Sequence, residues 1–463
     1  MKQLNILLFI ILLLTVNSYA NGIESFSKTI GTQEKESSNG LVIDSEGNFY
    51  LCGTSEGNLT AQSDTKYKNF FIQKLSSSGN ALWTKQHSQI DTNIQTEAVG
   101  LSIDADNNIY LGGNFVDRTN LNNVETGIFA TKYSSNGEPI WFNKIVDNAA
   151  SLGSIKVSND SKLYLAGDKS YWEFISGSME HNTSMFIAQY SLDGDKLLEK
   201  EFENIQLNGS THEVNDIEFD AQNNIYLVGK YISKPFDYPN GDSDIYLTKF
   251  SNSLNQEWSK ILGALDDIDE DISSSEELIS IKIVDGYIYG VGTTLGNFDS
   301  QHSYKNMSLY SRYGVFMKFD LYGTELIRKQ FSLNTQNTIP LKLLVDKNGV
   351  ISSIVLNGEM NIYTDFTNNI YRTISLHKLT FDASADITED TTLISDNDDI
   401  YYLHSLDADY TADGTLVTTS IKNKGGHFVI ANPPRDERDL DVELRVYRAS
   451  HPLMPISIVM YLL

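Results

Sequence analysis

One serine carries a pattern that could do covalent chemistry. Gly53, Ser55 and Gly57 form Gly-x-Ser-x-Gly, the tight turn that exposes the nucleophile of α/β-hydrolases. That turn must join a strand to a helix, whereas residues 48–52 are an aromatic and apolar run inside a repeat that shows no helical periodicity. We therefore interpret Gly53 as the last residue of a repeated strand and assign no catalytic role to Ser55.

Two acidic runs could hold a hard cation. Asp267, Asp269 and Asp271 alternate along one segment, and oxygen-bearing side chains alternate in the same way over residues 104–108. Such spacing suits Ca²⁺, but neither run has the glycine at the sixth position or the glutamate at the twelfth that a calcium loop uses. We expect solvated or turn-forming acids and no cofactor, with calcium at Asp267–Asp271 left open.

The other reactive side chains show no site signature. Cys52 is the only cysteine, so no internal disulfide can form, and its repeat position elsewhere takes Gly, Ala or Val, which predicts a small buried side chain. The eight histidines include no i, i+4 pair and no cysteine partner, so we predict no zinc site and place them on the surface or in loops. Some pair among the 61 acids could cleave glycans, but the pattern selects none. No catalytic, cofactor-binding or metal-ligating residue is assigned.

A repeat of about sixty residues organises the chain, and internal repeats of this kind mark propellers and solenoids. The clearest copies read Asp-Ala-Asp-Asn-Asn-Ile-Tyr and Asp-Ala-Gln-Asn-Asn-Ile-Tyr within residues 101–113 and 217–229. The aligned aspartate position recurs at 44, 104, 158 (Ser), 220, 284 (Val), 346 and 407. Seven copies at this regularity indicate seven equivalent structural units.

Each copy reads as four short antiparallel strands. The strands are rich in aromatic and β-branched residues and are separated by Gly, Asn, Asp and Ser turns, which predicts hairpins. In the second copy they span residues 99–104, 109–115, 128–133 and 140–145. A four-stranded unit buries its two apolar faces only by stacking between neighbours, so the sequence predicts an all-β, seven-bladed β-propeller.

The two chain ends are predicted to close the ring. The seventh copy supplies strands near 403–407, 415–421 and 427–430, and no fourth strand follows. Residues 25–30 precede the first copy and resemble the outer strands of later copies, so we expect them to complete the last blade beside 427–430. The propeller would then span residues 21–431. Residues 432–463, rich in Arg and Pro, are assigned to an extension outside the blades.

The repeat resembles the bacterial β-propeller repeat family known as SBBP. The resemblance rests on an apolar-Lys strand, Gly-x-x-x-Trp and Asp-x-x-x-Asn-x-Tyr, carried best by residues 70–113 and 128–167 and more weakly across about 25–430. It implies a secreted or surface propeller and brings no catalytic motif. Copies five to seven depart from it, with Val284 in place of the Asp and Ser352 in place of the Tyr.

The tryptophans Trp83 and Trp141 faintly resemble the docking turns of pyrroloquinoline quinone propellers. The same repeat position holds Leu198, Trp258 and Ile327 in later copies. A slot that accepts either aromatic or aliphatic side chains is typical of packing between blades, so we predict a structural role.

The first twenty residues predict export. Lys2, an apolar run over residues 6–16, and small residues Ser18 and Ala20 form the pattern of a cleavable signal peptide over residues 1–20. The run is shorter than the roughly 20 residues that span a bilayer. We expect a secreted, periplasmic or cell-surface protein without membrane insertion.

The net charge limits the classes of molecule that the protein is expected to bind. The formal charge of −26 disfavours nucleic acid, whose phosphates need a basic surface. We expect a monomeric, non-catalytic binding or scaffold module for a protein or glycan, contacted by the inserts 54–69, 114–127, 168–184, 230–244, 264–277 and 293–314. The alternative is a carbohydrate-active enzyme, a glycoside hydrolase or polysaccharide lyase, using carboxylates in the central funnel. Convergent titratable groups with shifted pKa values would favour the enzyme.

Overall fold

The computed structural model describes fourteen segments of the chain. They are residues 23–32, 34–60, 67–87, 93–147, 150–175, 178–202, 211–232, 243–263, 275–299, 312–333, 337–361, 370–394, 407–423 and 440–448. The signal-peptide prediction for residues 1–20 and the calcium prediction at Asp267–Asp271 lie outside these segments.

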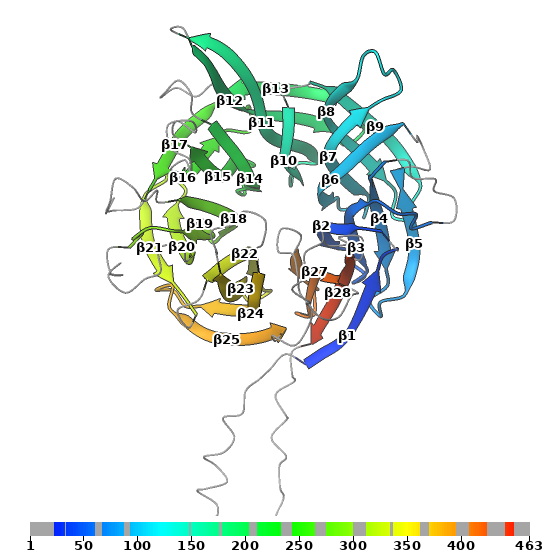
Figure 1. The fold of residues 1–463 in the computed structure, drawn as a ribbon. Helices are drawn as coiled ribbons and strands as arrows, with labels where there is room; N and C mark the ends of the chain where they lie inside the picture. Colours follow the sequence, from blue (N-terminus) through cyan, green and yellow to red (C-terminus); the bar gives the residue numbers. More distant parts are fainter. Residues whose placement is uncertain are drawn as a thin grey trace, which may run out of the picture.

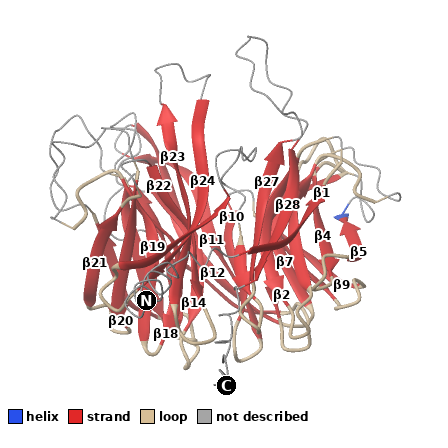
Figure 2. Cartoon of the chain, turned by 90° about the horizontal axis from the view of Figure 1, so that it is seen from below, coloured by secondary structure: helices blue, strands red, loops and turns tan. Residues whose placement is uncertain are grey.

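Seven four-stranded antiparallel sheets form a ring, as predicted (Figure 1). Seen at right angles, the strands run through the thickness of the ring (Figure 2).

Blade 1 contains β2 (Glu36–Ile43), β3 (Phe49–Ser55), β4 (Asn69–Leu75) and β5 (Ala81–Gln86). Blade 2 contains β6 (Ile94–Ile103), β7 (Ile109–Asp117), β8 (Glu125–Tyr133) and β9 (Pro139–Val146). Blade 3 contains β10 (Ala150–Val157), β11 (Lys162–Ile175), β12 (Ser178–Ser191) and β13 (Lys196–Phe202). Blade 4 contains β14 (Thr211–Phe219), β15 (Ile225–Ile232), β16 (Ser243–Phe250) and β17 (Gln256–Leu262). Blade 5 contains β18 (Glu276–Val284), β19 (Tyr287–Thr294), β20 (Tyr313–Asp320) and β21 (Glu325–Phe331). Blade 6 contains β22 (Asn337–Val345), β23 (Ile351–Asn361), β24 (Ile370–Phe381) and β25 (Ile387–Ile394). Blade 7 contains β26 (Ala408–Tyr410), β27 (Leu416–Asn423), β28 (Leu440–Arg448) and β1 (Ile23–Ile30).

The repeated Asp-x-x-x-Asn-x-Tyr motif builds the hairpin between the first two strands of a blade. Asp104 Oδ1 accepts the backbone N–H groups of Asp106 (3.0 Å) and Asn108 (2.8 Å), and its Oδ2 accepts the Asn108 amide and the Tyr110 hydroxyl (both 2.9 Å). Asp44 and Asp220 make the same set of bonds in their blades. The motif is therefore a turn cap that also fixes a fully buried tyrosine.

The predicted tryptophan slot lies between blades. Trp83 on β5 lies against the β8–β9 turn of blade 2, where its Nε1 donates to Ser135 O at 3.1 Å. A Cβ added to Gly137 in that turn would stand 2.7 Å from the indole. Trp141 donates in the same way to Leu192 O (3.2 Å) in blade 3, and Trp258 to Leu321 O (3.3 Å) in blade 5.

The size of the turn residue varies inversely with the side chain that it meets. Blade 3 carries Leu198 instead of Trp, and the facing turn of blade 4 carries Leu254, which is fully buried in the same core cluster. Blade 5 carries Ile327, and the turn of blade 6 carries the buried Ala385. Glycine thus faces the indoles because the ring leaves no room for a Cβ there.

This packing yields a stability prediction with an internal control. Gly137 (φ +83°) in the β8–β9 turn and Gly349 (φ +79°) in the β22–β23 turn share a left-handed backbone conformation, but a Cβ on Gly349 would meet nothing within 4 Å. Both alanine variants carry backbone strain, and only Gly137→Ala also displaces Trp83. We expect Gly137→Ala to lower the free energy of unfolding by about 1–3 kcal/mol more than Gly349→Ala, measured by urea denaturation. Equal losses would show that the indole contact is dispensable.

The ring closes with the chain's first strand, as expected, but the predicted partner was wrong. β1 pairs with β28, from Ile23↔Arg448 to Ile30↔Val442, and β28 pairs with β27. Figure 1 shows β1 beside β28 at the edge of the last blade. The extension assigned to residues 432–463 therefore contains the third strand of blade 7, and residues 427–430 lie outside the described segments. Leu444 (0% exposed) and Val446 (2%) supply the alternating buried face that this strand needs.

Two further predictions need correction. The turn of blade 7 is capped by Thr411, whose carbonyl accepts Gly414 N–H, so Asp407 is not the seventh cap. Residues 168–184 are not a loop insert, because β11 and β12 pair continuously from Lys162↔Ser191 to Ile175↔Ser178.

The prediction that Cys52 is a small buried side chain is confirmed, since its exposure is 0%.

Candidate functional site

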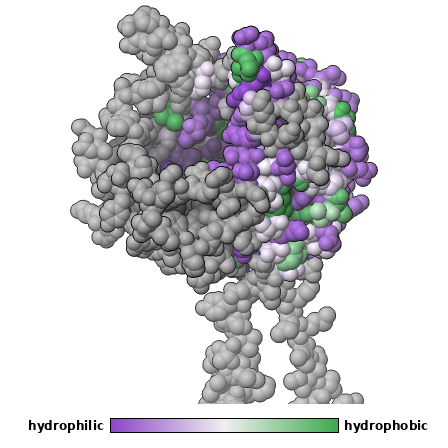
Figure 3. All heavy atoms as spheres, turned by 45° about the vertical axis from the view of Figure 1, so that its right-hand side comes forward, coloured by the Kyte–Doolittle hydropathy of each residue, from purple (hydrophilic) through white to green (hydrophobic). Residues whose placement is uncertain are grey.

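The innermost strands bring seven charged side chains to the middle of the ring. We call them the charged belt: Lys156 on β10, Asp216 and Glu218 on β14, Lys282 on β18, Lys342 on β22, and Asp407 and Asp409 at β26. The space-filling view shows a hollow at the centre, and much of its described edge is hydrophilic (Figure 3). The matching positions of blades 1 and 2 are uncharged, so the charge gathers on one side.

The three lysines of the belt pair with two of its four acids, Glu218 and Asp407. Glu218 accepts from Lys156 and from Lys282 (3.3 Å), which come from the blades on either side of it. Lys342 pairs with Asp407 at 2.9 Å, and Asp407 Oδ2 also accepts Leu41 N–H (2.8 Å) across the closing seam. Asp216 accepts the hydroxyl of Ser280 and the N–H of Ile281 (3.0 and 3.1 Å).

Shifted pKa values accompany this arrangement. Burial alone would raise the pKa of Glu218, but Lys156 and Lys282 outweigh it and hold the pKa at about 2. Burial lowers the pKa of Lys156 despite Glu218 and raises the pKa of Asp409 despite Lys282 and Lys342. Lys282 and Asp409 belong to blades 5 and 7, the two neighbours of blade 6, and the charge of Lys282 acts to lower the pKa of Asp409.

The charged belt is better suited to holding neighbouring blades together than to catalysis by a pair of carboxylates. A glycosidase needs one protonated and one free carboxylate flanking the substrate. Glu218 stays ionised and bound to two ammonium groups, and Asp216 and Asp407 accept backbone hydrogen bonds from the next blade. The titratable groups converge as the enzyme hypothesis requires, yet most of them form ion pairs with other members of the belt.

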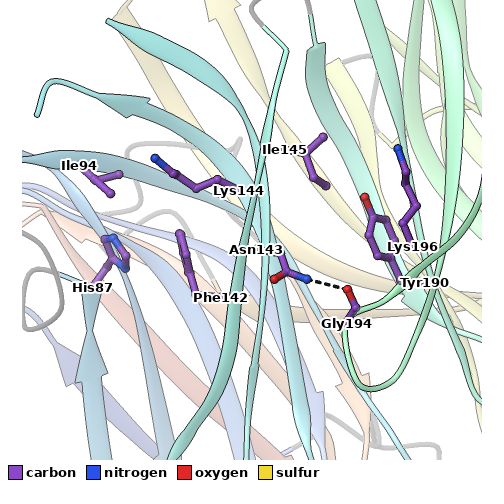
Figure 4. Close-up of a pocket in the computed structure, with 9 residues that line it drawn as sticks. All are labelled: His87, Ile94, Phe142, Asn143, Lys144, Ile145, Tyr190, Gly194 and Lys196. Atoms are coloured by element: carbon purple, nitrogen blue, oxygen red, sulfur yellow. Dashed lines mark hydrogen bonds between the residues drawn. The ribbon is translucent and has the colours of Figure 1, made fainter. Parts of the chain in front are cut away.

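A groove of about 700 Å³ lies on the outer side of the ring, over β9. Four consecutive β9 residues, 142–145, line it. β9 ends the strand order of its sheet, so its outer edge pairs with no named strand. His87, Ile94 and Phe142 lie on one side of the strand, and Tyr190, Gly194 and Lys196 lie on the other (Figure 4).

The groove combines flat rings with polar groups. The rings of His87 and Phe142 stack with centroids 4.7 Å apart, and Phe142 stacks on Phe129 at 5.3 Å. Asn143 Nδ2 donates to Gly194 O at 2.7 Å, which ties β9 to blade 3. The ammonium of Lys196 is at the rim, with 55% of its side chain exposed. His87 and Phe129 are 1% and 0% exposed, so the partly exposed Phe142 ring is the aromatic surface that the groove offers to a sugar or a peptide.

The serine and acidic motifs have structural roles. Ser55 Oγ is buried, 2.8 Å from Glu36 Oε1, and it accepts Gly57 N–H at 3.0 Å. Thr294, Glu276 and Gly296 repeat this arrangement in blade 5, so it is a feature of the fold. Asp104 caps its turn with both oxygens. Within the described segments, no group of three or more His, Cys, Asp or Glu side chains is placed to hold a metal ion.

The placement of the histidines on the surface or in loops was wrong for His212 and His377, which are buried on β14 and β24, whereas His87 lies just after β5 and is buried there. His87, His212 and His377 are 1%, 7% and 8% exposed. Burial lowers the pKa of His212 to about 4. The other five histidines lie outside the part of the chain whose side chains are described.

The sequence did not predict a hydrogen-bonded group of three polar side chains on blade 6. His377 Nε2 is 2.7 Å from Ser375 Oγ, and His377 Nδ1 is 2.7 Å from Asp390 Oδ1. The available signal was Ser-x-His, because residues two apart on a strand share a face. A search for i, i+4 pairs, the helical spacing, misses it.

The likenesses to known proteins are distant. No family model matches the chain, and no curated protein matches it. A catalytically inactive virginiamycin B lyase from Staphylococcus aureus, solved with quinupristin, is similar at 10% identity and TM-score 0.44, covering 90% of this chain and 98% of that one. The intramolecular trans-sialidase from Ruminococcus gnavus is similar at 10% identity and TM-score 0.40, covering 93% and 98%. No helix in the described segments is long and apolar enough to span a membrane. At these identities the likenesses carry no activity over to this chain, which is a seven-bladed, all-β propeller.

Proposed function

We propose that the chain is an exported propeller of the SBBP-like kind that binds a protein or glycan through the groove over β9. The observation that supports this most directly is the groove itself, which joins an open strand edge to the Phe142 ring, the Asn143 amide and the Lys196 ammonium. An open edge offers backbone donors and acceptors to an extended ligand, and the rings offer apolar contact area.

The test is a binding screen with matched variants. Mature protein would be screened against glycans and proteins, with and without Ca²⁺, and any hit repeated with Ile145→Arg. Ile145 and Leu262 occupy equivalent outer-strand positions and are both partly buried against core clusters, but only Ile145 lines the groove. We expect Ile145→Arg to weaken binding at least about tenfold, or about 1.4 kcal/mol, and Leu262→Arg to leave it unchanged. Equal effects of the two variants would exclude the groove.

The second candidate is a carbohydrate-active enzyme using the charged belt. The convergence of shifted pKa values at Glu218 and Asp409 favours it. Release of reducing ends or unsaturated uronic acids from a polysaccharide, lost in Asp409→Asn, would establish this function in place of pure binding.

A further inference from the structure

Ser375, His377 and Asp390 form a linear hydrogen-bonded chain on blade 6. Ser375 and His377 lie two residues apart on β24 and share a face. Asp390 lies on the adjacent β25, where it pairs with Leu379 and is therefore a diagonal neighbour of His377. Both contacts of the imidazole are 2.7 Å long, within the usual range of hydrogen bonds.

The roles of the three groups follow from their donors and acceptors. The Asp390 carboxylate can only accept, so His377 must carry a proton on Nδ1 and donate it there. In the tautomer that carries its one proton on Nδ1, the imidazole presents the lone pair of Nε2 to the Ser375 hydroxyl. A serine bonded to a base that a third group orients is the arrangement of an activated nucleophile, whatever the fold.

The surroundings are consistent with that use. His377 is 8% exposed, which fixes the ring, whereas Ser375 is only partly buried and so reachable. A second contact of Ser375 Oγ, with Asn357 O, is long at 3.4 Å and competes weakly for the proton. The acidic surface of the chain favours neutral or cationic substrates over anionic ones.

We propose that Ser375 is a nucleophile for acyl transfer from neutral esters, with His377 as general base and Asp390 as its positioning residue. Ser375 Oγ attacks the ester carbonyl while its proton passes to His377 Nε2. The ester C–O bond then breaks, and the leaving alkoxide takes that proton as an alcohol. Water attacks the acyl-serine with His377 again as base, which releases the acid and restores the hydroxyl. This activity is separate from ligand binding at the β9 groove.

The first experiment measures acylation of Ser375 directly. Full-length mature protein would be treated with a fluorophosphonate, which loses fluoride as the Oγ–P bond forms, and the adduct mapped by mass spectrometry. We expect one adduct, on Ser375, absent in Ser375→Ala and slowed by about 100-fold or more in His377→Gln. Asp390→Asn should also slow it, with hydrolysis of p-nitrophenyl acetate falling in parallel. Ser384→Ala is the control, because Ser384 is an exposed serine of the same blade.

A second variant, Ser375→Cys, keeps the proposal testable if the first variants do not fold. Ser375→Cys places a thiol beside the imidazole, and the natural Cys52 is buried, with a pKa raised by burial, so it gives little background. We expect iodoacetamide to modify this thiol faster than a free cysteine, and His377→Gln in that background to remove the acceleration. No fluorophosphonate adduct on Ser375, an equal one on Ser384, or an unaccelerated thiol would overturn the proposal.

Discussion

Deletion of residues 440–463 should open the ring and abolish the native fold. β28 carries both hydrogen-bonded edges of the closure, to β27 on one side and to β1 on the other. Its Leu444 and Val446 share a core cluster with Ile30 of β1 and Leu41 of blade 1. Loss of the strand exposes that cluster and removes the strand pairing that joins blade 7 to β1, so we expect aggregation or non-cooperative unfolding.

The matched control is a shorter deletion, of residues 449–463, which keeps β28 and should preserve the melting temperature and elution volume. A milder variant keeps the effect measurable. Leu444→Ala, at a fully buried position, should lower the free energy of unfolding by about 2–5 kcal/mol. A cooperative native-like transition in the protein that lacks residues 440–463 would contradict closure by β28.

Glu218→Gln is expected to cost about 1–3 kcal/mol of unfolding free energy, because it removes the carboxylate that two partly buried ammonium groups share. The change leaves the ammonium groups of Lys156 and Lys282 facing each other without the carboxylate between them. The Glu218 and Lys282 side chains are only 16% and 30% exposed, so water screens them weakly. Glu213→Gln on the same strand is the control, since Glu213 is 53% exposed beside Lys230 and should cost less than about 1 kcal/mol.

The same carboxylate sets an acid dependence. Its pKa falls from 4.5 to about 2 on folding, so its stabilising contribution is complete above pH 4.5 and lost as the pH falls towards 2. We expect the difference between the parent protein and Glu218→Gln, followed by urea titration, to shrink over that range. The triple change Lys156→Met, Glu218→Leu and Lys282→Met should recover most of the lost stability. A constant difference at every pH would show that Glu218 contributes through packing alone.

The local sequence pattern predicts the strands and turns within each blade, but it does not predict the contacts between blades. The Asp-x-x-x-Asn-x-Tyr motif marks a hairpin because all its bonds close within six residues, as they do at Asp104. Asp407 matched that motif by spacing, yet it reaches Leu41 of blade 1 and Lys342 of blade 6. The closing strand was misplaced for the same reason, since β28 pairs with residues more than four hundred positions away.

The candidate sites show the same division. Cys52 and the tryptophan slot were foreseen because the substitutions between repeats report the space at each position. The β9 groove depends on how three blades meet, and the Ser375 chain depends on side-chain directions across two strands.

The repeat, its seven copies, the four strands in each and the use of the first strand to close the ring all follow from periodicity and turn chemistry, which act over a few residues. The partner of that strand, the pairing of the charged belt and the alignment of Ser375, His377 and Asp390 arose only in the folded ring. Those contacts join residues that neither period nor spacing relates, and their energies depend on burial and geometry that exist only once the blades have packed together.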